Sequence, residues 1–323
     1  MREVYHNIFI EELLLPNNPL KYLNVFIIKG ESRSMIIDCG FNMEETKEII
    51  LNIFEKHGLD FDNTILYLTH LHSDHVGLAT FLREKGVEVY ISQVDGDILN
   101  NPDATWDATY KNAMLQGLSE DNFKIEEHPG YKYAITGKLD YTEAVIGDSL
   151  KIGDYDFEII DLSGHTPGMT GLYEKEHRLL FCGDHILQRI TPNITFWGFE
   201  YGDSLGTYFK NLDKVYDMEI VHLFSSHREL VKDHRERIDE LKLHHEKRLD
   251  EVRNALTLKR YSSIRDVTKQ LHWDIRSNNF DEFPQSQKSF ATGEAHAHLE
   301  HLRYRGEVDY IQKFEKLYYF LMI

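Results

Sequence analysis

Three histidines and one aspartate lie within six consecutive positions of this 323-residue chain, as His70, His72, Asp74 and His75. Imidazole and carboxylate groups are common ligands of divalent transition metals in proteins. The group follows the apolar segment 64–69, which has the composition of a buried strand. A rigid strand followed by a turn lets neighbouring side chains converge on one ion. The pattern therefore predicts a metal site at this strand end, with a solvated histidine-rich turn as the alternative.

Three further candidate ligands each follow their own apolar segment. His165 lies in a Ser-Gly-His-Thr-Pro-Gly segment after a strand-like run. Asp184 follows the apolar residues 179–182, and His227 follows residues 219–226. A solvated histidine-rich turn at 70–75 would not explain why three other apolar segments also end in a candidate ligand. The metal site is therefore the better interpretation.

The chain resembles the metallo-β-lactamase superfamily over about residues 4–255. The resemblance rests on four features: the HxHxDH motif, the histidine in GHTPG, the aspartate in a Cys-Gly-Asp turn, and His227 after a strand. The resemblance implies an α+β fold, a four-layer αββα sandwich with metals at one edge between its two sheets. It also implies two groups of three ligands and a bridging aspartate. The first group is His70, His72 and His165. The second group is Asp74, His75 and His227, and the bridge is Asp184.

A centre of this kind has a defined chemistry. Two divalent ions roughly 3.5–4 Å apart can hold a hydroxide between them, lower its pKa toward neutrality and polarise a carbonyl or phosphoryl oxygen. Asp74 and Asp184 are the candidate catalytic residues. Imidazole and carboxylate ligands make zinc the first expectation, with manganese and iron as alternatives. The predicted function is hydrolysis of a small ester, thioester or lactone by a metal-bridging hydroxide.

The net charge of the chain distinguishes a small-molecule hydrolase from a nuclease. The chain has 36 Lys and Arg residues against 54 Asp and Glu residues, a formal charge of −18. Two divalent ions would add about +4 and leave about −14, which opposes long phosphate backbones. We therefore expect a small-molecule substrate and disfavour nucleic acid. The main alternative is a β-lactamase-like endoribonuclease or other phosphodiesterase; a ligand-sensing protein without catalytic activity and an iron oxidoreductase are weaker ones.

Asp38 and the two cysteines adjoin the candidate ligands. Asp38 ends an apolar strand, where a carboxylate is costly unless it is paired. We expect it to orient a ligand histidine through the ring nitrogen that faces away from the metal; capping of its own turn is the alternative. Cys39 and Cys182 each follow an apolar run and are expected to be buried without binding metal. The low cysteine content and the lack of a leader or membrane-length apolar segment predict a cytoplasmic protein with no membrane contact.

Length and composition predict one large domain with an accessory part. We expect a catalytic domain over residues 1–257 and a C-terminal domain over residues 258–323. The order of helix, loop, helix and short β element in this tail resembles the winged-helix-like tail of the branch that contains the β-lactamase-like endoribonucleases. Its mixed charges suit homo-oligomer formation better than phosphate contact. Because every candidate ligand precedes residue 228, removal of the tail is expected to leave metal binding largely intact.

Two segments are candidates for substrate cover. Residues 97–140 interrupt the alternation of strands and helices, and we expect a helical insertion that serves as a lid or pocket wall, or packs on its own domain. Its apolar stripe at helical spacing consists of Trp106, Tyr110, Met114 and Leu118. The loop 190–201 is expected to line the entrance to the site. Its aromatic residues are Phe196, Trp197, Phe199 and Tyr201.

Periodicity and turn signals predict several of the surrounding elements. They are a hairpin over 22–38 and helices over 43–57, ending at Gly58, over 74–85, and over 233–256. A further helix is expected at about 288–304, and it carries His296, His298 and His301. Positions 296 and 298 point about 200° apart on a helix. We therefore place these histidines at a surface or core edge and exclude them from the metal site.

Overall fold

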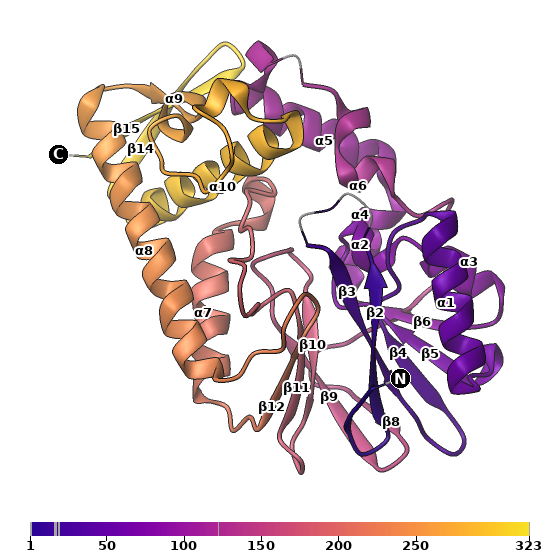
Figure 1. Cartoon of the computed structure of the whole chain (residues 1–323). Helices are drawn as coiled ribbons and strands as arrows, with labels where there is room; N and C mark the ends of the chain where they lie inside the picture. The colour runs from indigo at the N-terminus through magenta and orange to yellow at the C-terminus, as the bar shows by residue number, and fades with distance from the viewer. Residues whose placement is uncertain (1, 16–17, 19, 122, 323) are drawn as a thin grey trace.

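The structure is a computed structural model that describes residues 2–15, 18, 20–121 and 123–322. Two mixed β-sheets lie against each other, and helices cover their outer faces (Figure 1). The C-terminal segment adds helices and a small sheet, which lie beside the helical segment that follows β6. None of the described helices combines the length and apolar character needed to cross a lipid bilayer.

The first sheet follows the order of the chain from β1 to β7. Its strands pair antiparallel from β1 to β4 and parallel from β4 to β7. They are β1 (Arg2–Tyr5), β2 (Ile8–Leu14), β3 (Tyr22–Ile28), β4 (Ser34–Ile37), β5 (Thr64–Tyr67), β6 (Glu88–Ile91) and β7 (Thr142–Glu143). The antiparallel pairing of β3 with β4 confirms the predicted hairpin.

The second sheet has the order β12-β11-β10-β9-β8. Only β11 and β12 pair in parallel within it, and the other pairs are antiparallel. Its strands are β8 (Ser149–Ile152), β9 (Tyr155–Asp161), β10 (Thr170–Glu174), β11 (Leu179–Gly183) and β12 (His222–Ser225). The space between the two sheets is filled by buried side chains that include Phe26, Tyr67, Phe157, Phe181 and Phe224.

Helices complete the sandwich on both sides. On the side of the first sheet lie α1 (Glu44–His57), α2 (Ser73–Val76) and α3 (Ala79–Glu84). On the side of the second sheet lie α7 (Ser204–Asp217) and α8 (His234–Leu258). Buried apolar side chains join each sheet to its helices. The layers are thus helix, sheet, sheet and helix, as expected for the αββα sandwich.

The predicted single helix over 74–85 is wrong, because the chain forms α2 and α3 with Gly77 and Leu78 between them. The backbone amide of Cys39 donates to the carbonyl oxygen of His75 (2.8 Å), so this carbonyl does not continue the helix ladder. Gly77 packs on the turn after β4, where a Cβ atom would lie 2.2 Å from the amide nitrogen of Asn42. The helix therefore ends where the metal-ligand motif meets the neighbouring turn.

The insertion 97–140 contains the end of α4 (Gln93–Asn100) and all of α5 (Pro102–Leu115) and α6 (Pro129–Lys132). Its predicted stripe is buried only at its far end, because Leu118 is buried whereas Tyr110 is 47% exposed. Leu118 and Ala113 pack against Phe280 and Phe283 of the C-terminal segment. The insertion therefore packs partly on the tail.

The tail contains α9 (Ile264–Thr268), α10 (Gln285–Tyr304) and a small sheet of order β13-β15-β14. The strands of this sheet are β13 (Ser262–Ser263), β14 (Val308–Lys313) and β15 (Lys316–Leu321). All residues of α10 from 291 to 302 are buried. The expectation that its histidines lie at a surface or core edge is therefore wrong. This part of the helix is covered because α7, α8, α9 and β14 contact α10.

Candidate metal centre

All seven predicted ligands converge at one edge of the sandwich. His70 and His72 follow β5, and Asp74 and His75 lie in α2. The other three, His165, Asp184 and His227, follow β9, β11 and β12, respectively. Six of the seven are buried and His72 is partly buried. Their ligand atoms form three overlapping groups, each within 4.8 Å. The groups are His70, His72 and His165; His70, His75 and Asp184; and Asp74, His75 and His227.

The first group is a triad of imidazoles. His70 Nε2 lies 3.1 Å from His72 Nδ1, and the ring centroid of His165 lies 4.6 Å from that of His72. His165 Nε2 is buried and has no hydrogen-bond partner among the described residues. Three imidazole nitrogens that converge in this way are suited to a cation.

The second group combines imidazoles with carboxylates. His227 Nε2 lies 3.3 Å from His75 Nε2 and 3.4 Å from Asp74 Oδ2. Asp184 reaches both groups, because its Oδ1 lies 3.4 Å from His227 Nε2 and its Oδ2 lies 3.8 Å from His165 Nε2. The carboxylate of Asp184 is thus the side chain between the two groups.

The ring nitrogens that face away from the centre are held by the protein. His165 Nδ1 donates to the carbonyl oxygen of Asn193 (2.8 Å), and His227 Nδ1 donates to that of Tyr22 (2.9 Å). A carbonyl can only accept, so each neutral ring keeps its proton on Nδ1 and turns the lone pair of Nε2 toward the centre. This arrangement orients imidazoles for metal binding.

Asp38 orients His75, as predicted. Its Oδ2 lies 2.8 Å from His75 Nδ1, and its Oδ1 accepts from the amide of Thr69 (2.9 Å). The Thr69 hydroxyl donates to Asp38 and lies 3.0 Å from His70 Nδ1. The Asp38 carboxylate is fully buried. It therefore supports one histidine of each group, one directly and one through Thr69.

The electrostatics of the residues alone already favour cations at the centre. Burial lowers the pKa of His227, but Asp184 and Asp74 outweigh this effect and raise the pKa to about 10. The pKa of His75 is raised well above its usual value in the same way, by Asp38 and Asp184 against burial. Burial and the neighbouring His165 lower the pKa of His72 to about 3. A metal ion in the carboxylate-rich half would take over the positive charge of these protons, so its binding should release protons.

Asp95 is a buried residue near the centre that the sequence analysis missed. Its Oδ2 accepts from the amide of Leu71 (2.9 Å) and the hydroxyl of Thr166 (2.7 Å), and its Oδ1 accepts from the amide of Gly168 (2.7 Å). It therefore connects the HxHxDH turn to the GHTPG turn. Burial raises the pKa of Asp95 to about 6, while these hydrogen bonds lower it. Its sequence signal is weak, because an aspartate in the first turn of a helix is usually an exposed acid that favours the helix dipole.

The aromatic loop contacts the centre through Trp197 as well as through the carbonyl oxygen of Asn193. The ring of Trp197 stacks on that of His72, with centroids 5.9 Å apart, and its Nε1 donates to the carbonyl oxygen of His165 (3.1 Å). Phe196 is buried and packs on His296 of α10. Phe199 and Tyr201 are each more than one third exposed. The loop thus contacts the ligands at Asn193 and Trp197 and packs on α10 at Phe196.

The insertion also contacts the centre. Ser73, within the HxHxDH motif, donates from its hydroxyl to the carbonyl oxygen of Pro129 (3.3 Å). Asn112 of α5 donates to the carbonyl oxygen of Trp197 (3.2 Å). The insertion therefore adjoins both the ligand turn and the aromatic loop, and its role as a lid or pocket wall stays a prediction.

The remaining candidates lie outside the centre. His298 Nε2 pairs with His245 Nδ1 (3.1 Å), and His301 pairs with Asp203 (2.9 Å). Cys39 and Cys182 are buried free thiols. Burial raises the pKa of both thiols, that of Cys182 to about 12. His298, His301 and the two cysteines thus lie apart from the three ligand groups.

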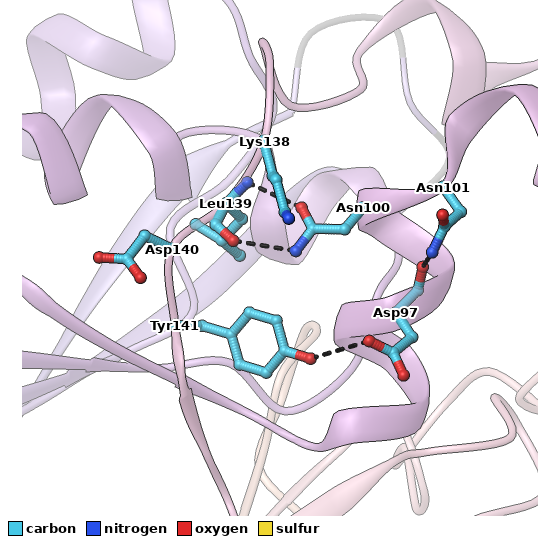
Figure 2. A pocket seen from close by; sticks show the side chains of 7 residues that line it. All are labelled: Asp97, Asn100, Asn101, Lys138, Leu139, Asp140 and Tyr141. Carbon is cyan, nitrogen blue, oxygen red and sulfur yellow. Dashed lines mark hydrogen bonds between the residues drawn. The ribbon is translucent and has the colours of Figure 1, made fainter.

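A cavity of about 520 Å³ lies beside the end of α4, and Figure 2 shows its lining. None of the seven candidate ligands lines it. Asn100 donates to and accepts from the backbone of Leu139, and the Tyr141 hydroxyl donates to Asp97 (3.3 Å). These groups bind one another between α4 and the segment 138–141, which precedes β7. The cavity is therefore separate from the candidate metal centre.

Comparisons with known proteins agree with this geometry. Residues 20–260 match the family model of the metallo-beta-lactamase superfamily. The hydroxyacylglutathione hydrolase GloC of Haemophilus influenzae is 32% identical over 159 residues, which are 49% of this chain and 63% of that protein. An acyl-coenzyme A thioesterase of Gallus gallus is 22% identical over 169 residues, which are 50% of this chain and 56% of that protein. The chain thus spans less than two thirds of each of these two relatives.

A metallo-beta-lactamase family protein from Thermus thermophilus has the same fold, with a TM-score of 0.83. The alignment covers 98% of this chain and 99% of that chain at 21% sequence identity. The likeness includes the C-terminal segment, because nearly the whole of both chains is covered. The family match spans well over half of the sequence and contains all seven candidate ligands. The chain therefore belongs to the metallo-β-lactamase superfamily.

Proposed function

We propose that this protein is a binuclear metal-dependent hydrolase of small thioesters, with small esters and lactones as related substrates. The observation that carries the proposal is the pair of ligand groups that share Asp184. Seven ligands exceed what one tetrahedral site can use. We propose that His70, His72 and His165 hold one ion, that Asp74, His75 and His227 hold the other, and that Asp184 contacts both.

The residues fit divalent cations by their chemistry. His165 Nε2 is buried without a hydrogen-bond partner among the described residues, which is costly for a polar atom unless another group binds it. Imidazole and carboxylate ligands favour zinc, with manganese and iron as alternatives. A pair of such ions lowers the pKa of bound water and polarises a carbonyl oxygen. The residues described here would hold these ions and fix the orientation of their ligands.

Two observations support a small thioester over a nucleic acid. Relatives of the chain include a hydroxyacylglutathione hydrolase and an acyl-coenzyme A thioesterase, both named for thioester substrates. The formal charge of −18 opposes the binding of long phosphate backbones. A β-lactamase-like endoribonuclease with a winged-helix-like tail is the alternative function, and it rests on the resemblance of the tail.

A substrate panel on protein saturated with metal tests the proposal. We expect the highest kcat/KM for a small acyl thioester, compared with lactones, β-lactams, phosphodiesters and single-stranded RNA. Asp184→Asn serves as the control for contaminating activity, because a contaminant would not respond to this change. The highest kcat/KM for RNA or a phosphodiester, lost in Asp184→Asn, would overturn the small-substrate proposal and favour the nuclease alternative.

A further inference from the structure

The orientation of His165 depends on the loop between β11 and α7. His165 Nδ1 donates to the carbonyl oxygen of Asn193, and Trp197 of the same loop donates to the carbonyl oxygen of His165. Trp197 also stacks on His72. Two members of the imidazole triad therefore contact this loop. Any displacement of the loop would be transmitted to the triad.

Helix α10 of the tail holds this loop by direct hydrogen bonds. Asn193 Nδ2 donates to Glu294 Oε2 (2.9 Å) and to the carbonyl oxygen of Phe290 (3.4 Å). The amide of Phe196 donates to the carbonyl oxygen of Gly293 (3.1 Å). A Cβ atom at Gly293 would lie 2.1 Å from Thr195 Oγ1, so glycine permits the close approach of helix and loop. The loop is thus bound to one turn of α10.

Glu294 is itself held in place by a pairing with α8. Its side chain is almost fully buried, and Arg248 of α8 donates from Nε to its Oε1 (3.3 Å). The guanidinium of Arg248 lies 4.2 Å from the ring centroid of Trp273 and donates to the carbonyl oxygen of His272. Burial raises the pKa of Glu294, and Arg248 and Asn193 oppose this shift. Glu294 therefore has one defined position, from which it can hold Asn193.

We propose that Glu294 is a positioning residue: it holds Asn193, and Asn193 orients the metal ligand His165. Through this contact the tail is a structural part of the metal centre. The inference rests on the proposed metal centre. It reverses the expectation that the tail is dispensable for metal binding. That expectation considered only the positions of the ligands along the chain, whereas α10 lies next to them in space.

The test compares Glu294→Ala and Glu294→Gln with Glu300→Gln. Glu300 is a matched control, because it is a buried glutamate of the same helix that pairs with Arg303 and Tyr319 instead of the loop. Zinc affinity is measured by competition with a chromophoric chelator, and the visible spectrum of cobalt-substituted protein reports the ligand geometry. We expect Glu294→Ala to lower the affinity for the ion held by the imidazole triad about tenfold to a hundredfold and to change the cobalt spectrum. Such losses are usual when a residue that supports a metal ligand is removed. Glu300→Gln should change zinc affinity by no more than about twofold and leave the cobalt spectrum unchanged, even where it lowers the unfolding temperature.

Unchanged zinc affinity and cobalt spectrum in the Glu294 variants, with two ions bound to the parent protein, would overturn this inference alone. Failure of the parent protein to bind metal would overturn the proposed function as well. If Glu294→Ala does not fold, Glu294→Gln and Asn193→Ala decide the question. Asn193→Ala keeps the carbonyl that accepts from His165 and removes only the two hydrogen bonds from its own side chain to α10. Weakened zinc binding in Asn193→Ala supports the chain from Glu294 to His165, and unchanged binding in both variants contradicts it.

Discussion

Asp184→Asn should reduce turnover by at least about a hundredfold, which is the scale on which the loss of one preorganised electrostatic group acts. The amide keeps the size of the side chain but loses the negative charge that lies between the two ligand groups. Asp184 Oδ1 approaches His227 and its Oδ2 approaches His165 and His75, so one substitution affects both groups. The protein should stay folded with reduced metal occupancy, because His70, His72 and His165 are unchanged. Steady-state kinetics with parallel metal analysis measure both effects.

Asp74→Asn is the comparison for this variant. Asp74 approaches His227 and His75 but belongs to the second group alone. We therefore expect it to reduce turnover less than Asp184→Asn does. Near-normal turnover of Asp184→Asn at full metal loading would show that position 184 does not connect the two ions, and the assigned centre would have to be withdrawn.

Asp95→Ala should lower the free energy of unfolding of the metal-free protein by about 3 kcal/mol, because it leaves buried donors without their acceptor. These donors are the amides of Leu71 and Gly168 and the hydroxyl of Thr166. Urea denaturation of metal-free protein measures the loss. Asp97→Ala is the matched control, since Asp97 is an exposed aspartate two residues further along α4, and it should change stability by less than about 0.5 kcal/mol.

The pH dependence of this loss has a definite sign. Because the pKa of Asp95 is raised from 3.8 to about 6 in the folded protein, folding favours its protonated form. The stabilisation from this shift is fully present below the unfolded pKa and is lost as the pH rises through about 6. Asp95→Ala should therefore cost more at about pH 4 than at about pH 8. A loss that is equal to that of Asp97→Ala at both pH values would contradict the linking role of Asp95.

The candidate ligands could be predicted from the sequence because each follows a short apolar strand. The HxHxDH motif, the GHTPG segment and His227 are local patterns. The family resemblance implies how their ligands are grouped. Asp38 was also predictable, since a carboxylate at the end of a buried strand requires a partner. These predictions depend on a few residues that are close in sequence, where the types of side chain and their spacing carry the chemistry.

The contacts between distant segments could not be predicted in this way. Asp95 looks like an ordinary acid in the first turn of a helix, and its partners lie 24 to 73 positions away. His296 and His298 point in opposite directions on α10, which suggested that one side faces solvent. Both are buried because other elements enclose this helix. The break at Gly77 likewise depends on a turn that precedes it by more than thirty residues, so local helix propensity gave a single helix.

The central claim is that one chain holds two metal ions in two groups linked by Asp184. The most direct test is elemental analysis of protein that has been saturated with metal and then separated from unbound metal. The same analysis is made of His227→Ala. We predict close to two transition-metal ions per chain in the parent protein and close to one in His227→Ala, which keeps the imidazole triad complete. A saturating content of one ion in the parent protein, or two ions in His227→Ala, would contradict the binuclear centre.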